Sequence, residues 1–422
     1  MAFEGAPPAT AKHDSAAIAA LVAAVQHNCH IADARHAAAL TMCTYLLQMR
    51  EFFRWERGIA LGATLPRAAV GAWLAEREAL WEALVHEDYR PLPLPLPAPR
   101  CRSGGGSGRA RQADPFDTDA VNAALAPHQL LYGAGLVGSG RPVFFVAELH
   151  SRAEREGLAV LQAGRERART LLAPPAALAG GGTGPIVLRR ESMARWCWER
   201  TEAHAMRPRP GSALHAMLAH YGLDGAGFTA ALPRWLDDQC ETAVLHELGE
   251  HALGRRWGNR WRELRAAVAA HPAPQAARGE ALVRALRDQL VDLGTTLPAL
   301  LAQGTDGTDG TDGTDGTDGG TDGTRGASGA LHAWFAGYEG LREATFPALA
   351  AGYQAWRLGD AGEMLRAQCA HGLRHFEAMA AALLEEGPPS RRSAELARFL
   401  APGGATGVPP ALVCRWPEPV SA

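Results

Sequence analysis

Three segments of the chain combine histidine with carboxylate residues at spacings that could bind a metal ion. The first is the run HNCHIADARH at residues 27–36. On a helix His30 adjoins Asp33 one turn later, and Asp33 shares a face with His36, so imidazole and carboxylate groups can meet at one metal. The alternative is a core histidine that is hydrogen-bonded to Asp33 or to the backbone. Both interpretations stay open from the sequence.

The second segment is ETAVLHELGEH, which begins at Glu241. It is not the H-E-x-x-H zinc motif, because His246 and His251 are five residues apart and point about 140° away from each other on a helix. A helical projection places Glu241 inside an apolar stripe, with Glu247 and His251 one turn apart along its edge. The same projection turns His246 and Glu250 toward solvent. A carboxylate in an apolar stripe must be salt-bridged, metal-bound or protonated as a catalytic acid.

The third segment carries His371 and His375, one helical turn apart beside an apolar stripe. Two such histidines could form one edge of a metal site, or they could lie on a solvated helix flank. Imidazole and carboxylate ligands together favour iron or manganese held between helices. The predicted metal ligands are His30, Asp33, His36, Glu241, Glu247, His251, His371 and His375.

A nucleotide cofactor is not expected. Residues 133–138 match G-x-G-x-x-G, but the apolar run PVFFV follows where a helix N-terminus would have to meet a pyrophosphate. The chain also has no G-x-x-x-x-G-K-[ST] loop. The glycines at 133–138 are therefore predicted to belong to a β-hairpin made by residues 129–137 and 141–149.

Helices must position these side chains over most of the chain. Apolar residues recur at helical spacing within 14–87, 191–302, 331–351 and 360–386. The hairpin, with further short strands at 157–163 and 185–188, predicts one small sheet. The fold class is mainly α: a helical bundle with a small antiparallel β-sheet inserted in the first half.

Composition shifts divide the chain into regions. Proline and glycine dominate near residues 91–108, and TDG triplets repeat over 305–319 without the D-x-D-x-D-G pattern of a calcium loop. The predicted regions are an N-terminal helical region (14–90), a Pro/Gly-rich linker (91–115), a small β-containing subdomain (116–190), a helical domain (191–302), a disordered TDG repeat (303–329), a C-terminal helical hairpin (330–400) and a tail (401–422).

Charge and composition exclude several classes of protein. The 422 residues are 47% hydrophobic, with 42 basic and 45 acidic residues and a net charge of −3, so a strongly basic nucleic-acid binder is not expected. Residues 1–15 show no signal-peptide pattern, and the early apolar stretch 16–25 is too short to cross a membrane. Seven cysteines without a C-x-x-C pair argue against a disulfide framework. A soluble, cytoplasmic protein is predicted, and a homo-oligomer stays open.

The chain resembles an uncharacterised bacterial, proteobacterial protein family, and the resemblance covers about residues 14–258. It implies no activity, but it suggests that the proline linker and the TDG tract are additions of this chain. A weaker resemblance, through carboxylate and histidine spacings on several helices, is to the helical haem-oxygenase-like di-iron oxidases. The runs that carry the family resemblance are CHIADARHA (29–37), CTYLLQMREFFRWERG (43–58), YGAG and GRPVFFVAEL (within 132–149), AGRERAR (163–169) and LRRESMARWCWE (188–199).

Two functional hypotheses follow. The first is a metal-dependent, non-haem iron or manganese enzyme within a helical bundle, of the oxidoreductase kind, with an open coordination position for dioxygen or water. The alternative is a non-catalytic helical scaffold or regulatory interaction protein, in which the same clusters are buried salt-bridge networks that fix helix register. The hypotheses differ in whether the clusters bind a metal or satisfy each other.

Overall fold

A computed structural model describes residues 9–84, 90–97, 111–137, 140–178, 184–223, 227–303, 322–384, 389–401, 403 and 408–417. The chain divides into two compact units, each described here by itself. The first comprises Met1–Ala179 and Pro185–Trp198, and the second comprises Gly180–Gly184 and Glu199–Ala422. The predicted fold class is confirmed: the protein is mainly helical, with a small sheet in its first half.

Three helices open the first unit: α1 (Ala9–Ala37), α2 (Met42–Glu56) and α3 (Arg67–Leu84). The Thr41 side chain accepts a hydrogen bond from the Thr44 amide and so starts α2. Aromatic residues bind these helices together, since Phe52, Phe53 and Trp73 are buried in one cluster.

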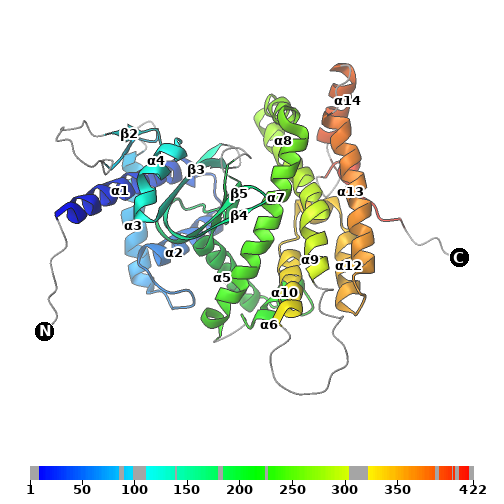
Figure 1. The fold of residues 1–422 in the computed structure, drawn as a ribbon, viewed down its shortest axis with the longest axis horizontal. Helices are drawn as coiled ribbons and strands as arrows, with labels where there is room; N and C mark the ends of the chain where they lie inside the picture. The colour runs from blue at the N-terminus through cyan, green and yellow to red at the C-terminus, as the bar shows by residue number, and fades with distance from the viewer. Residues whose placement is uncertain are drawn as a thin grey trace. The chain divides into compact units, whose positions relative to one another are not determined.

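The first unit also contains a curled five-stranded sheet (Figure 1). β3 (Leu130–Val137) and β4 (Arg141–Arg155) form the predicted hairpin, which is confirmed. Glu156 and Gly157 join β4 to β5 (Leu158–Arg169), both with positive φ, as a two-residue type I′ turn requires. The sheet is antiparallel apart from one pair, because β7 (Ile186–Arg189) runs parallel to β5. β6 (Ala176–Leu178) completes the order β3-β4-β5-β7-β6.

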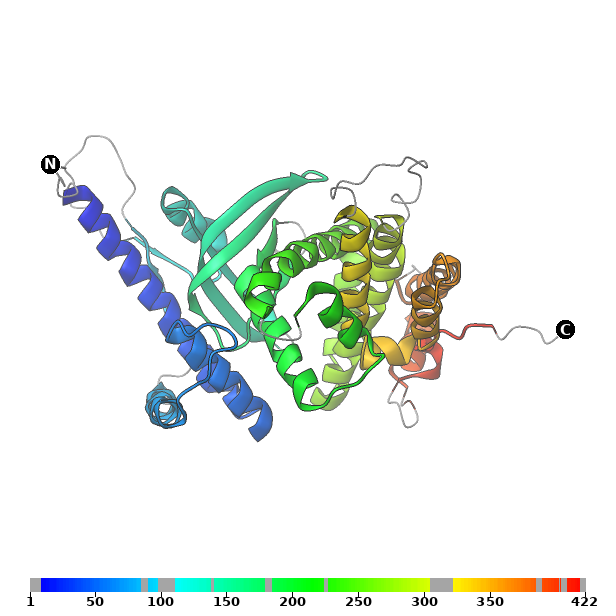
Figure 2. The same cartoon turned by 90° about the horizontal axis from the view of Figure 1, so that it is seen from below.

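The long helix α1 packs along this sheet (Figure 2). Its apolar side buries Val25 and Cys29 in a cluster with Phe144 and Val146 of β4. This apolar side of α1 is therefore the face that meets the sheet. The smaller elements of this unit are β1 (Leu94–Pro95), β2 (Gln112–Ala113), α4 (Thr118–Leu125) and the 3-10 turn η2 (Ala126–His128), and α5 (Arg190–Met206) begins directly after β7.

Helices that run alongside each other build the second unit (Figure 1). A large apolar core holds them together, with Leu286, Leu297, Phe346 and Phe376 all fully buried. The elements are α6 (Ala213–Tyr221), α7 (Phe228–Ala269), α8 (Ala273–Val291), the π-helix η3 (Asp292–Thr296), α9 (Leu297–Gln303), α10 (Asp322–Ala336), α11 (Leu341–Thr345), α12 (Ala348–Arg357), α13 (Glu363–Leu384), α14 (Pro389–Leu400) and the 3-10 turn η4 (Pro410–Leu412).

One glycine sets the close approach of α7 to the end of α8. A Cβ atom at Gly249 would lie 2.7 Å from Val291 Cγ1 and 3.0 Å from Thr295 Oγ1. Real Cβ atoms do not approach so closely, so only glycine permits this packing. The contact brings the middle of α7 against the π-helix η3, where polar side chains of both helices gather.

The structure differs from the sequence prediction at several points. The helix expected over 331–351 is interrupted between α10 and α12, because Gly340 has a φ of 64° and Pro347 begins a new helix. Within the predicted tail, Leu412 and Cys414 are buried, and the Cys414 amide donates to the Thr345 carbonyl at 2.7 Å. Residues 98–110 of the predicted linker and 304–321 of the predicted disordered repeat lie outside the described residues. The described parts of the linker carry β1 and β2, which pair with each other, and α10 begins at Asp322 within the predicted repeat. No described helix combines the length and the apolar character needed to span a bilayer.

Candidate metal centre

One group of potential metal ligands stands out in the part of the chain that the structure describes. His246 and Glu250 of α7 and Asp288 of α8 each offer a ligand atom, and these atoms all lie within 4.8 Å of one another. The pair on α7 is one helical turn apart, with His246 Nε2 at 3.4 Å from Glu250 Oε1. No other His, Cys, Asp or Glu group of three or more among the described residues meets this criterion.

Asp292 fixes the orientation of the imidazole in this cluster. Its side chain is only 1% exposed, and Oδ1 lies 2.9 Å from His246 Nδ1 and accepts from Trp334 Nε1 at 3.4 Å. Arg342 Nη2 donates to Oδ2 at 2.6 Å. A carboxylate on one ring nitrogen holds the proton there and leaves the other nitrogen, Nε2, facing Glu250. Asp292 also opens the π-helix η3, and π-helical turns within α-helices are frequent at functional sites.

The cluster is electrostatically balanced by its own side chains. Arg287 Nη2 lies 2.7 Å from Glu250 Oε1 and 3.7 Å from Asp288 Oδ1. Burial lowers the pKa of His246, but the carboxylates of Asp292 and Glu250 outweigh burial and raise that pKa well above its ordinary value. With His246 protonated, three cations therefore face three carboxylates.

Burial also raises the pKa of each carboxyl group, and the cations counteract it unequally. Arg342 and His246 hold the pKa of Asp292 below its ordinary value. The pKa of Glu250 is lowered by His246 and Arg287 in the same way. Burial prevails only at Asp288, whose pKa is raised. Asp288 is thus the carboxyl group of the cluster with the weakest cationic support.

The helical projection of α7 was wrong about its polar face. His246 and Glu250 do not point to solvent, since their side chains are 25% and 14% exposed and they meet Asp292 and Arg287. The reason is that α7 contacts several elements of the unit, including α8, η3 and α10, so it has more than one buried side.

The three predicted ligands of α1 lie in the first unit, and two of them are held by arginines. Arg77 Nη1 lies 2.6 Å from His30 Nε2 and 3.2 Å from Nδ1. Asp33 is fully buried, accepting from Arg141 Nη2 at 2.9 Å and from the Leu171 amide at 2.8 Å. Both residues are thus held by hydrogen bonds in the first unit, but His30 is bonded to Arg77 and not, as the core alternative described, to Asp33 or to the backbone. His36, also on α1, is half-buried.

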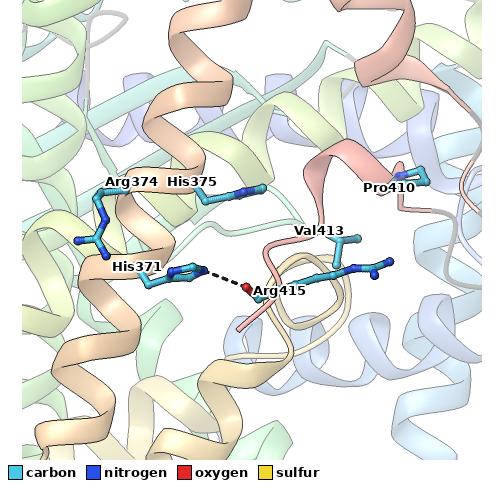
Figure 3. A pocket seen from close by; sticks show the side chains of 6 residues that line it. All are labelled: His371, Arg374, His375, Pro410, Val413 and Arg415. Atoms are coloured by element: carbon cyan, nitrogen blue, oxygen red, sulfur yellow. Dashed lines mark hydrogen bonds between the residues drawn. The ribbon is translucent and has the colours of Figure 1, made fainter. Parts of the chain in front are cut away.

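The other predicted ligands lie in the second unit. Glu247 on α7 is buried, whereas Glu241 and His251 on the same helix are half-buried. His371 and His375 of α13 line a surface pocket, where His371 Nε2 donates to the Arg415 carbonyl at 2.9 Å (Figure 3). Among the described residues, none of the eight predicted ligands belongs to a group of three potential ligands.

The residues that do gather carry a sequence signal that the prediction did not use. His246 and Glu250 are four residues apart, and so are Asp288 and Asp292, on helices that are consecutive in the chain. Consecutive antiparallel helices pack together, so two polar pairs at helical spacing can face each other.

Acidification is expected to destabilise the first unit through His30. Burial and the neighbouring Arg77 lower the pKa of His30 from 6.5 to about 3, so the folded protein binds fewer protons than the unfolded chain between these values. The stability contribution is complete above pH 6.5 and is lost as the pH falls toward 3, by at most about 1.4 kcal/mol per pH unit. The free energy of unfolding, measured by chemical denaturation at several pH values in this range, should fall more steeply with decreasing pH for the wild type than for His30→Gln. An equal pH dependence of the two proteins would contradict a neutral, buried His30.

Comparisons with known proteins identify the family but no activity. A model for the N-terminal domain of a family of unknown function, DUF6866, matches residues 20–189. The model for the C-terminal domain of the same family matches residues 194–311 and 320–399. No curated protein and no solved structure matches the chain. The two models together cover most of the chain, and the protein therefore belongs to the DUF6866 family.

Proposed function

We propose that this protein is a metal-dependent enzyme of the helical-bundle type, which binds iron or manganese at His246, Glu250 and Asp288. The observation that carries the proposal is the convergence of three ligand atoms within 4.8 Å, one of them on an imidazole that Asp292 orients. Metal-bound histidines usually donate their second ring nitrogen to a carboxylate in this manner. One imidazole with two carboxylates suits iron and manganese.

The chemistry follows from the number of ligands. Three protein side chains would leave coordination positions open, and a metal ion with open positions can activate water or dioxygen. His246 would bind through Nε2 once that nitrogen has lost the proton that it carries in the metal-free protein, because Asp292 holds Nδ1. Arg287 would have to release Glu250 when the ion binds. The charge of Arg287 would then face the carboxylate oxygens that do not bind the ion. Substrate oxidation is the reaction class we assign to this centre.

A second function is favoured by the ion pair between Arg287 and Glu250 at 2.7 Å. In that alternative the cluster is complete without a metal, and it fixes the register of α7 against α8 and η3 as part of a non-catalytic scaffold. Buried ion pairs can specify structure in this way even when they add little stability. The two functions predict different results for Mn²⁺ binding and for the effect of Mn²⁺ on the stability of the protein.

Titration of Mn²⁺ into the chelator-treated, full-length protein tests the proposal. We expect one ion per chain, and we expect Asp288→Asn to weaken binding by about tenfold or more, because one charged ligand is lost. The matched control is Glu377→Gln on α13, whose carboxylate pairs with Arg256 at the surface and should leave binding unchanged.

Arg287→Gln distinguishes the two functions. If Arg287 competes with the metal, this variant should bind Mn²⁺ more tightly than the wild type, and its melting temperature should rise when the ion is added. In the scaffold alternative the variant loses stability and Mn²⁺ restores none of it. Absence of saturable Mn²⁺ or Fe²⁺ binding by the wild type would refute the enzyme proposal.

A further inference from the structure

Aromatic side chains form a row through the second unit, which begins beside the cluster around Asp292. Trp334 of α10 donates from Nε1 to Asp292 Oδ1 at 3.4 Å, and this carboxylate is the one that orients His246. The Trp334 ring stacks on Tyr338, with ring centres 5.1 Å apart and 22° between the two planes. Both rings are buried, so the row begins in the core.

The row continues from α10 to α12 and ends at the surface. Phe335 has its ring centre 4.8 Å from that of Trp334 and 5.9 Å from that of Tyr338. It stacks on Tyr353 of α12, with ring centres 4.2 Å apart and 19° between the planes. Tyr353 in turn stacks on Trp356 at 5.8 Å, and Trp356 is half-buried, so its ring reaches solvent. Electrons tunnel readily between conjugated rings that lie against one another, so the row is a route for single electrons.

Tyr353 has a proton acceptor within this row. Its hydroxyl lies 2.7 Å from His332 Nδ1, and no other hydrogen-bond partner of that hydroxyl is present among the described residues. Because a buried hydroxyl donates its hydrogen to an available acceptor, the phenol donates and Nδ1 carries the lone pair. Burial, His220 and Arg357 lower the pKa of His332 from 6.5 to about 4, so its ring is neutral near pH 7 and can take up a proton.

We propose that Tyr353 and His332 form a redox-active pair, through which the metal centre exchanges single electrons with a one-electron carrier at the surface beside Trp356. The inference rests on the proposed function, because it names the electron route of that centre. When an oxidised carrier takes one electron from Tyr353, the hydroxyl proton moves to His332 Nδ1 and leaves a neutral tyrosyl radical beside an imidazolium ring. Tyr353 then recovers one electron from the metal ion through Phe335 and Trp334, and its proton returns from His332.

The charges along the row favour a radical at Tyr353 over one at Trp334. The guanidinium of Arg342 lies over the rings of Trp334 and Tyr338, 4.9 and 5.6 Å from their centres. A cation over a ring is attracted to its electrons and opposes a positive charge on that ring, so these two rings pass the electron without retaining the charge. Arg357 also lies over Tyr353, at 5.8 Å, but the tyrosyl radical is neutral once its proton has moved to the imidazole.

Photo-oxidation of the metal-free, full-length protein, followed by electron paramagnetic resonance, tests the pair. The oxidant is tris(bipyridine)ruthenium(III), generated by a light flash with persulfate as the electron acceptor. We expect a tyrosyl radical signal, most of which is lost in Tyr353→Phe. In His332→Gln the radical should form about a hundredfold more slowly, because a positioned base speeds proton transfer by about this factor. Glutamine can still accept the hydrogen bond of the phenol, so this variant should fold normally.

The matched control is Tyr132→Phe in the first unit. Tyr132 and Tyr353 are both 2% exposed, but the Tyr132 hydroxyl donates to the Pro115 carbonyl, which cannot take up a proton. This variant should therefore leave the tyrosyl signal unchanged. A signal that survives Tyr353→Phe, or one that forms equally fast in His332→Gln, would overturn the proposal.

Repeating the flash with Mn²⁺ tests the link to the metal centre. The bound ion should shorten the lifetime of the tyrosyl radical, because it supplies the electron that Tyr353 recovers. Phe335→Leu should abolish most of this shortening, whereas Phe376→Leu, the same substitution in the same apolar core but outside the row, should not. An unchanged lifetime in protein that binds Mn²⁺ would overturn the proposal. If no Mn²⁺ binds, the proposed function fails, while loss of the radical in Tyr353→Phe still supports the redox-active pair.

Discussion

Replacing Glu166 with glutamine is expected to lower the free energy of unfolding of the first unit by about 3–5 kcal/mol. Glu166 on β5 is fully buried, and its Oε1 accepts from Arg189 Nε at 2.7 Å and from Ser192 Oγ at 3.1 Å. Its Oε2 lies 3.7 Å from Arg169 Nη1. Both arginines are buried, with 4% and 1% of their side chains exposed. Glutamine keeps the size of the side chain but removes the carboxylate charge that lies against both guanidinium groups.

The pKa values of Glu166 and Arg169 support the same expectation. Burial raises the pKa of Glu166, but Arg189 and Arg169 outweigh burial and hold that pKa below its ordinary value. Burial and the nearby Arg195 lower the pKa of Arg169 to about 9. The guanidinium of Arg169 is thus already in an unfavourable position, and Glu166 is among the groups that support its charge.

Hydrogen exchange followed by mass spectrometry can measure how much stability Glu166→Gln removes from the first unit alone, through the protection of the amides of β4 and β5. The control is Glu148→Gln on β4, which breaks a pair with Arg167 at 3.0 Å whose side chains are 44% and 45% exposed. That variant should cost less than about 1 kcal/mol, because solvent screens the exposed pair. Equal effects of the two substitutions would show that burial of Glu166 does not determine its contribution.

Strand β5, which carries Glu166, shows how far the sequence predicts the fold. The hairpin β3–β4 was predictable because the turn residues at 138–140 separate two apolar segments that contain aromatic residues. The strand expected at 157–163 continues to Arg169 as β5, and the charged run that includes Glu166 and Arg169 hid this continuation. Charged residues usually indicate solvent exposure, so a pattern method assigns them outside the core. Their burial depends on partners that lie elsewhere in the sequence: Arg189 of β7 pairs with Glu166, and Phe52 and Trp55 of α2 lie against the guanidinium of Arg169.

The candidate metal centre was predictable to a lesser degree. Helical spacing correctly marked α7 as a helix that carries histidine and carboxylate side chains, but it selected Glu241, Glu247 and His251 instead of His246 and Glu250. The contact between His246 and Asp292 joins residues that are 46 positions apart. A projection of one helix describes which residues share a face, but the neighbouring helices decide which faces are buried.

Asp292→Asn is the second substitution with a large expected effect. It should lower the free energy of unfolding of the second unit by about 3 kcal/mol, because Arg342 and His246 lose the buried carboxylate that neutralises them. This is the lower end of the usual range, since the side chains of both cations are about a quarter exposed. Chemical denaturation can be compared with Glu280→Gln, which breaks the surface pair with Arg265 in the same unit and should cost less than about 1 kcal/mol.

The same variant separates the role of Asp292 in stability from its role in orientation. If Asp292 orients His246 for a metal ion, Asp292→Asn should also weaken Mn²⁺ binding by about 10–100-fold, as the loss of such outer partners does. Addition of Mn²⁺ should then stabilise the wild type more than the variant. A loss of stability that Mn²⁺ leaves unchanged in both proteins would favour the scaffold alternative. Unchanged stability together with unchanged Mn²⁺ binding would show that neither account describes Asp292, because both need its carboxylate charge beside His246.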